Sequence, residues 1–165
     1  METPRDIFLM QQNYATLFSL ANKVQAEGDK FIGKLTSRQF MAMMALAHLP
    51  EDEATINHIA RKLGTSKQSV KQLISILEGK GYLTSVPSRK DGRAVNIHFT
   101  GAGRDIFLES GEKGMAFLAT LFNGFAVDEL ETLWKLLKKL YGFNGENMDG
   151  FEDEANILLT NERGV

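Results

Sequence analysis

The sequence predicts a mainly α-helical fold that contains one small β-hairpin. Through most of the chain, apolar residues recur at spacings of three and four, which is the period of an amphipathic helix. Between residues 82 and 99 the period changes to two, as in β-strands, and the two halves of this stretch flank a polar segment. The chain has 165 residues, of which 43% are hydrophobic, so one compact domain with appended helices is expected.

The first predicted helix spans residues 7–27 and is expected to end at Gly28. Its apolar residues are spaced alternately three and four apart and form a narrow seam: Ile7, Met10, Tyr14, Leu17, Ala21 and Val24. A seam of this width suits pairing with another helix. We therefore expect the helix to contribute to a homodimer.

Two further helices are predicted from their end signals. Thr36 begins the first, because Thr36 and Gln39 can form a capping box, and Pro50 closes that segment. Thr55 can cap the next, and Gly64 is well placed as the left-handed residue that terminates it.

The helix that follows at once covers about Ser66 to Gly79, with Thr65 as the expected cap and Gln68 completing a capping box. Its apolar residues fall on one face: Val70, Leu73, Ile74 and Leu77. The opposite face is polar: Lys67, Gln68, Lys71, Gln72 and Ser75. Two helices joined by a few residues that include a glycine form a helix-turn-helix.

A predicted β-hairpin comes directly after the helix-turn-helix. Residues 82–86 form one strand, and Val95, Ile97 and Phe99 alternate with their neighbours in its partner. The connecting segment, residues 87–93, is polar and basic, and Asp91-Gly92 is a turn signal. A basic hairpin in this position is a wing.

Two more helices complete the predicted order. Thr100 is expected to cap a long helix that runs to about Phe122, and a last helix runs from Val127 to Tyr141. Residues 142–165 are rich in glycine and acidic residues, and we expect this extension to be partly ordered.

Charge is concentrated in the same region. The net charge is −2, yet residues 61–93 hold eight Lys and Arg against two Asp and Glu, a local net charge of +6. A basic patch on an otherwise acidic chain is the expected footprint of a surface that binds phosphate.

Three stretches around the predicted hairpin form a strand–wing–helix pattern: Lys80-Gly81-Tyr82-Leu83, then Asp91-Gly92-Arg93-Ala94, then Phe99-Thr100-Gly101-Ala102-Gly103. With this pattern the sequence resembles the MarR (multiple-antibiotic-resistance regulator) family of bacterial transcription regulators, over about residues 7–141. The order of the helices and the wing also agrees. The chain departs from the family pattern at Ser85 and Val86, where basic residues are usual, and in the extension after Gly142.

The residue types assign roles on DNA. The second helix of the helix-turn-helix, about Ser66 to Gly79, is the recognition helix, and its N-terminal turns should enter the major groove. Four long side chains there can reach base edges: Lys67, Gln68, Lys71 and Gln72. Three hydroxyl side chains near the helix start suit phosphate contacts: Thr65, Ser66 and Ser69. In the wing loop, Arg89 and Lys90 can compensate for the two missing strand charges. The resemblance implies that Arg93 reaches into the minor groove, that Asp91 holds its side chain, and that Gly92 shapes the turn.

The predicted domain organisation follows. Residues 1–34 and 101–141 form a helical dimerisation region, residues 35–100 a winged helix-turn-helix DNA-binding domain, and residues 142–165 a C-terminal extension. We expect a cytoplasmic, ligand-responsive repressor that binds a pseudo-palindromic double-stranded DNA site as a homodimer. The resemblance implies a small effector, apolar or aromatic, in the cleft between the dimerisation region and the winged domain.

Other functions are less well supported by the sequence. A winged helix that contacts protein and not DNA remains an alternative, although it would not need the basic patch. An enzyme using a carboxylate pair such as Glu152 and Glu154 is disfavoured, because nothing in that polar tail would shift their pKa values. We expect no cofactor and no metal site, because the chain lacks cysteine and its three histidines are scattered. No apolar stretch approaches the length of a membrane span, so no membrane partner is expected.

Overall fold

A computed structural model describes residues 3–152. Six α-helices and two strands follow one another in these residues, with a short 3₁₀ helix at each of two turns: α1 (Pro4–Ile32), α2 (Ser37–Ala47), η1 (Glu51–Glu53), α3 (Ile56–Leu63), α4 (Lys67–Gly79), β1 (Leu83–Pro87), β2 (Val95–Phe99), α5 (Gly101–Leu121), α6 (Val127–Tyr141) and η2 (Gly142–Asn144). Residues 153–165 of the predicted extension, including Glu154, lie outside the described part. Within residues 3–152 no helix is both long and apolar enough to cross a membrane.

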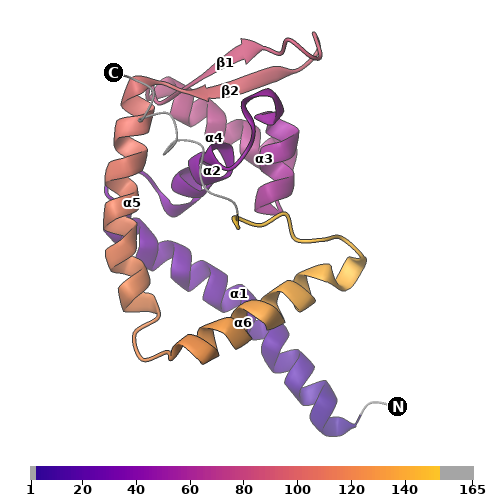
Figure 1. Ribbon diagram of the computed structural model, residues 1–165. Coiled ribbons are helices and arrows are strands. Elements are labelled where there is room, and N and C mark those ends of the chain that lie inside the picture. The colour runs from indigo at the N-terminus through magenta and orange to yellow at the C-terminus, as the bar shows by residue number, and fades with distance from the viewer. Residues whose placement is uncertain (1–2, 153–165) are drawn as a thin grey trace.

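The elements form two regions (Figure 1). In one, helices α2, α3 and α4 pack together beside the antiparallel pair of β1 and β2. In the other, α1 and α6 cross below that domain, and α5 runs down one side from the hairpin to the turn before α6. The predicted mainly α-helical fold with a hairpin wing is confirmed.

The hydrophobic core lies inside the winged domain. Its largest fully buried side chains include Met43 of α2, Ile59 of α3 and Leu77 of α4, with Ile97 of β2. Phe107 of α5 stacks on Phe40 of α2 with 5.3 Å between ring centroids, which joins α5 to this core. The recognition helix is therefore held from behind by apolar packing.

Local signals set most helix starts as predicted. The Thr36 side chain accepts from the Gln39 amide at 3.2 Å, and the Gln39 side chain accepts from the Thr36 amide at 3.2 Å, so the expected capping box is present. Thr55 caps α3, and Gly64 ends it with a φ of 63°. The helices predicted at Thr100 and Val127 also begin there.

The predicted stop at Gly28 is wrong, because α1 continues to Ile32. Gly28 is buried where α1 passes close to two other elements. A Cβ at this position would lie 2.6 Å from the Ser37 hydroxyl and 3.3 Å from the Phe117 ring. This glycine permits a close approach within the helix, and Gly33, with a φ of 87°, follows the true end.

The predicted cap of the recognition helix is displaced by one residue. Ser66, not Thr65, caps α4, and its hydroxyl accepts from the Ser69 amide at 3.1 Å. The Thr65 amide is engaged in closing α3, since it donates to the Ala60 carbonyl at 3.0 Å while the Gly64 amide donates to Arg61. These two bonds form a Schellman motif, so Thr65 belongs to the preceding helix end.

The hairpin departs slightly from its predicted pattern. The first strand begins at Leu83, one residue later than expected, and Leu83 pairs with Phe99 across the ladder. Ile97 is buried as the alternation predicts, but Val95 is 42% exposed. Val95 pairs with Pro87 at the outer end of the hairpin, where the strands extend beyond the core (Figure 1).

Candidate nucleic-acid interface

The exposed face of α4 carries the predicted base-reading side chains. Burial of Val70 and Ile74 fixes the rotation of the helix, which turns four polar side chains to solvent: Lys67, Gln68, Lys71 and Gln72. The two lysines are four residues apart, as are the two glutamines, so each pair lies along one side of the helix. Within residues 3–152, neither lysine forms an ion pair, so both charges are available to a ligand.

The start of α4 carries the hydroxyl groups predicted to contact phosphate. Ser66 and Ser69 are joined by a hydrogen bond of 3.0 Å between their hydroxyl groups, and Thr65 lies immediately before them. The first backbone amides of a helix have no partner inside the helix, and they add a positive potential at this end. The turn between α3 and α4 thus presents several donors beside Lys67.

The wing loop is built by hydrogen bonds inside the hairpin. The Ser88 amide donates to the Ala94 carbonyl at 3.0 Å, which closes the loop, and the Ala94 amide donates to the Asp91 carbonyl at 3.0 Å. The Asp91 side chain accepts from the backbone amide of Arg93 at 3.0 Å. Gly92 lies within this last turn without using a positive φ.

Asp91 therefore shapes the backbone next to Arg93. No ion pair joins the Asp91 carboxylate to the Arg93 guanidinium in the part of the chain that the structure describes. Arg93 and Arg89 are exposed, and neither guanidinium has an ion-pair partner among residues 3–152. Both arginines are free to extend toward a negatively charged ligand.

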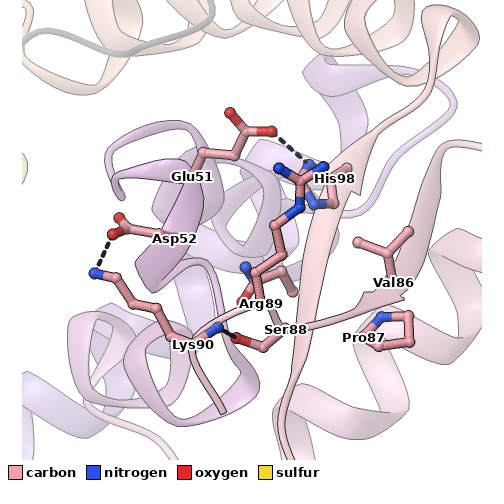
Figure 2. A pocket seen from close by; sticks show the side chains of 9 residues that line it. Glu51, Asp52, Val86, Pro87, Ser88, Arg89, Lys90 and His98 are labelled. Carbon is pink, nitrogen blue, oxygen red and sulfur yellow. Dashed lines mark hydrogen bonds and ion pairs between the residues drawn. The ribbon is translucent and has the colours of Figure 1, made fainter. Parts of the chain in front are cut away.

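Lys90 has a different environment, because it forms an ion pair with Asp52 of η1 (Figure 2). The hydrogen bond from Lys90 lowers the pKa of the Asp52 carboxyl below its ordinary value, and the same bond raises the pKa of Lys90. Beside it, His98 of β2 lies 3.5 Å from a Glu51 carboxylate oxygen. These contacts tie the wing to the acidic turn η1.

These partners of Lys90 and His98 were not predicted from the sequence. The signal that could have revealed them is the run of three acidic residues at 51–53, opposite in charge to the wing loop. A hollow of about 530 Å³ lies between this turn and the wing. A backbone bond of 2.8 Å from the Ile97 amide to the Ala54 carbonyl also connects the two segments.

Comparison with known proteins shows a similarity to the MarR family. A model of the MarR family matches residues 34–94, which span α2, the helix-turn-helix and the wing loop. The transcriptional activatory protein BadR of Rhodopseudomonas palustris is 26% identical over 152 residues, covering 89% of this chain and 84% of BadR.

Solved structures show the same fold. A probable transcriptional regulator from Pseudomonas aeruginosa superposes with a TM-score of 0.72 at 22% identity, covering 80% of this chain and 98% of the other. MepR of S. aureus, in a complex with DNA, superposes with a TM-score of 0.70 at 23% identity, covering 78% and 96%.

The winged domain of this chain is thus similar to that of the MarR family. The resemblance found in the sequence is therefore confirmed, and the matched segment contains all of the predicted DNA-contacting residues.

Outside the winged domain, the chain exposes many large apolar side chains. On α1 they include Ile7, Phe8, Leu9, Met10, Tyr14, Leu17, Phe18 and Leu20. On α5 and α6 and the turn between them they include Met115, Leu118, Phe125, Val127, Leu136 and Leu140. The predicted seam of α1 is part of this surface, since Tyr14 is 67% exposed. Exposed apolar area on this scale marks an interaction surface.

A groove of about 1260 Å³ lies between α1, the α3–α4 turn, α6 and the segment after it. Aromatic and aliphatic side chains predominate in its lining, among them Phe18, Trp134, Leu137, Tyr141 and Phe143. Polar groups at its edge include Arg61, on the helix that precedes the recognition helix. The groove thus lies between the dimerisation region and the winged domain of the sequence prediction.

Proposed function

We propose that this protein is a transcription regulator that binds a specific, pseudo-palindromic site on double-stranded DNA as a homodimer. One observation carries the proposal: the recognition helix of a MarR-like chain presents Lys67 and Lys71 to solvent, without ion-pair partners among residues 3–152. Two unpaired positive charges beside the positive end of a helix contribute little to the stability of the fold. Both would attract the phosphates of DNA.

The proposed DNA contacts differ in whether they reach base edges, phosphates or the minor groove. The two lysines and the glutamines Gln68 and Gln72 are long enough to reach base edges, and a glutamine can bond adenine through two hydrogen bonds. The proposed phosphate contacts come from the hydroxyl groups at the start of α4. Arg93 and Arg89 of the wing approach the neighbouring minor groove, where the potential is most negative over A·T-rich sequence.

The dimer is proposed to form through residues 1–34 and 101–141. The apolar side chains of α1, α5 and α6 would lie against their counterparts in a second copy, which removes them from water. A two-fold dimer places one recognition helix on each half-site, about one helical turn apart. Residues 35–100 then act as the DNA-binding unit of each protomer.

A small apolar or aromatic effector is proposed to bind the groove between these regions, because apolar rings dominate its lining. An effector there would favour a dimer geometry whose recognition helices no longer match the half-sites. Repression is the proposed mode of action, since a dimer seated on a promoter excludes the polymerase. A reporter driven by the bound promoter should then increase when the protein is removed.

The test is a binding titration with the inverted repeat that the protein selects from a random duplex library. Lys67→Ala and Lys71→Ala should each weaken binding, and a lysine that contacts only phosphate should lower the slope of log affinity against log salt by about one. Lys139→Ala, on the exposed face of α6, is the matched control and should leave affinity and slope unchanged. Failure to select any sequence, with equal binding by wild type and both variants, would contradict the proposal.

A further inference from the structure

The segment that follows α6 turns back along the protein and contacts three helices. We call residues 145–152 the C-terminal strap. After α6 ends, Gly145 adopts a φ of 84° and the chain reverses toward α3 (Figure 1). The strap lies in the extension that departs from the family pattern, and none of the predicted DNA contacts uses it.

Lys62 of α3 is the main anchor of the strap. Its ammonium group donates to the Gly150 carbonyl at 2.6 Å and to the Asp149 carboxylate at 3.2 Å, and it lies 5.4 Å from the centre of the Phe151 ring. The Lys62 side chain is only 6% exposed, although Lys62 is a charged residue in the first helix of the helix-turn-helix. Burying an ammonium group without partners costs free energy. Among residues 3–152, the strap supplies all the hydrogen-bond partners of the Lys62 ammonium group.

The strap also packs on the core and on α6. The Phe151 ring meets His48, at the end of α2, edge to face with 5.3 Å between ring centroids, and it covers the core of the winged domain. At the last described residue, Glu152 forms an ion pair of 3.3 Å with Lys138 of α6. The strap therefore connects α2, α3 and α6.

Within one chain, few other contacts orient helix α6 relative to the winged domain. None of its residues is buried. Its last residue, Tyr141, lies against the turn of the helix-turn-helix, where a Cβ on Gly64 would meet the Tyr141 hydroxyl at 3.0 Å. In a single chain, the contact of Tyr141 with Gly64 and the contacts of the strap therefore set the angle of α6 relative to the winged domain.

We propose that the C-terminal strap clamps the winged domain to α6, and that Lys62 is its positioning residue. The clamp holds one orientation of the recognition helix relative to the dimerisation helices, which restricts the half-site spacings that the dimer can bind. This consequence rests on the proposed function, while the clamp itself is a property of one chain.

The experiment measures the orientation directly in the full-length protein. Because the chain has no cysteine, Ser75→Cys on α4 and Lys135→Cys on α6 place two spin labels at defined exposed positions. The doubly labelled chain is mixed with an excess of unlabelled wild type, so that each assembly carries at most one labelled chain. Double electron–electron resonance then reports the distance distribution within that chain.

Lys62→Met keeps the length of the side chain and removes its donors, and Phe151→Ala removes the ring from the other end of the contact. Each is expected to broaden the distance distribution and add a second population. Lys62→Arg keeps the charge and donors and should retain the narrow distribution. Lys30→Met, which removes an exposed lysine paired with Glu27, is the matched control and should not change it.

The proposal is overturned if Lys62→Met and Phe151→Ala, shown to be folded by circular dichroism, both retain the wild-type distribution. Equal broadening by the Lys30→Met control would overturn it as well. The measurement needs neither DNA nor a dimer, so loss of the proposed DNA-binding function would leave its result unaffected.

Discussion

Replacement of Gly103 by alanine is expected to destabilise the protein, although alanine is the better helix former. Gly103 lies in the first turn of α5, directly against the chain that enters β1. A Cβ at this position would overlap the Tyr82 carbonyl oxygen and lie 2.8 Å from the Tyr82 carbonyl carbon. Since carbon atoms in contact are about 3.5–4.0 Å apart, the helix would have to move by about 1 Å.

The size of the effect follows from what that movement breaks. Thr100 joins α5 to the chain that enters β1 through two hydrogen bonds. Its amide donates to the Tyr82 carbonyl at 3.1 Å, and its hydroxyl donates to the Gly81 carbonyl at 2.6 Å, with the Tyr82 carbonyl 3.1 Å away as the alternative acceptor. Weakening these bonds costs about 1 kcal/mol each, and the better helix propensity of alanine offsets about 1 kcal/mol. With about 1–2 kcal/mol for forced repacking, the free energy of unfolding should fall by roughly 2–3 kcal/mol.

Thermal unfolding at a fixed protein concentration measures this loss, which corresponds to a fall in Tm of roughly 5–10 °C for a chain of this size. Gly101→Ala is the matched control. Gly101 lies in the same helical turn with nothing within 4 Å of a Cβ, so alanine there should not lower the stability and should raise it by up to about 1 kcal/mol through helix propensity. A Gly103→Ala protein as stable as wild type would refute the close-packing argument.

Three other outcomes are expected. Arg93→Ala should weaken DNA binding severely with little change in Tm, and more on operators with A·T-rich flanks than with G·C-rich flanks; equal titrations by both proteins would remove the wing from the interface. Asp52→Asn should release Lys90 and steepen the slope of log affinity against log salt by about one, whereas an unchanged slope would show that Lys90 does not reach phosphate. Wild type should sediment as a dimer at micromolar concentration, and Leu17→Lys should shift it toward monomer because a charge would enter the seam; a well-folded wild-type monomer would contradict the proposed interface.

Local structure was predictable because its causes are local. The capping box at Thr36, the left-handed Gly64 and the apolar face of the recognition helix all depend on residues within four positions of one another. The change of period between residues 82 and 99 located the wing for the same reason. The excess of Lys and Arg in residues 61–93, the basic window, predicted that the interface lies on these elements. The cap of α4 moved from Thr65 to Ser66, because the adjacent end of α3 uses the Thr65 amide.

Contacts between distant segments were not predictable in this way. Gly28 resembles a helix terminator in sequence, and only the packing of α1 against Ser37 and Phe117 shows that it is a point of close approach. The partner of Lys90 is an acidic residue from another part of the chain, and Lys62 meets Gly150 across 88 positions.

The sequence by itself determined which segments are helical, which are strands, and which face of α4 is polar, because periodicity and caps act over a few residues. Tertiary structure alone decided which charges of the basic window stay free and which are already paired. It also decided how the winged domain is held against α6. Those outcomes depend on distances between segments that are far apart in the chain, and such distances exist only once the core has formed.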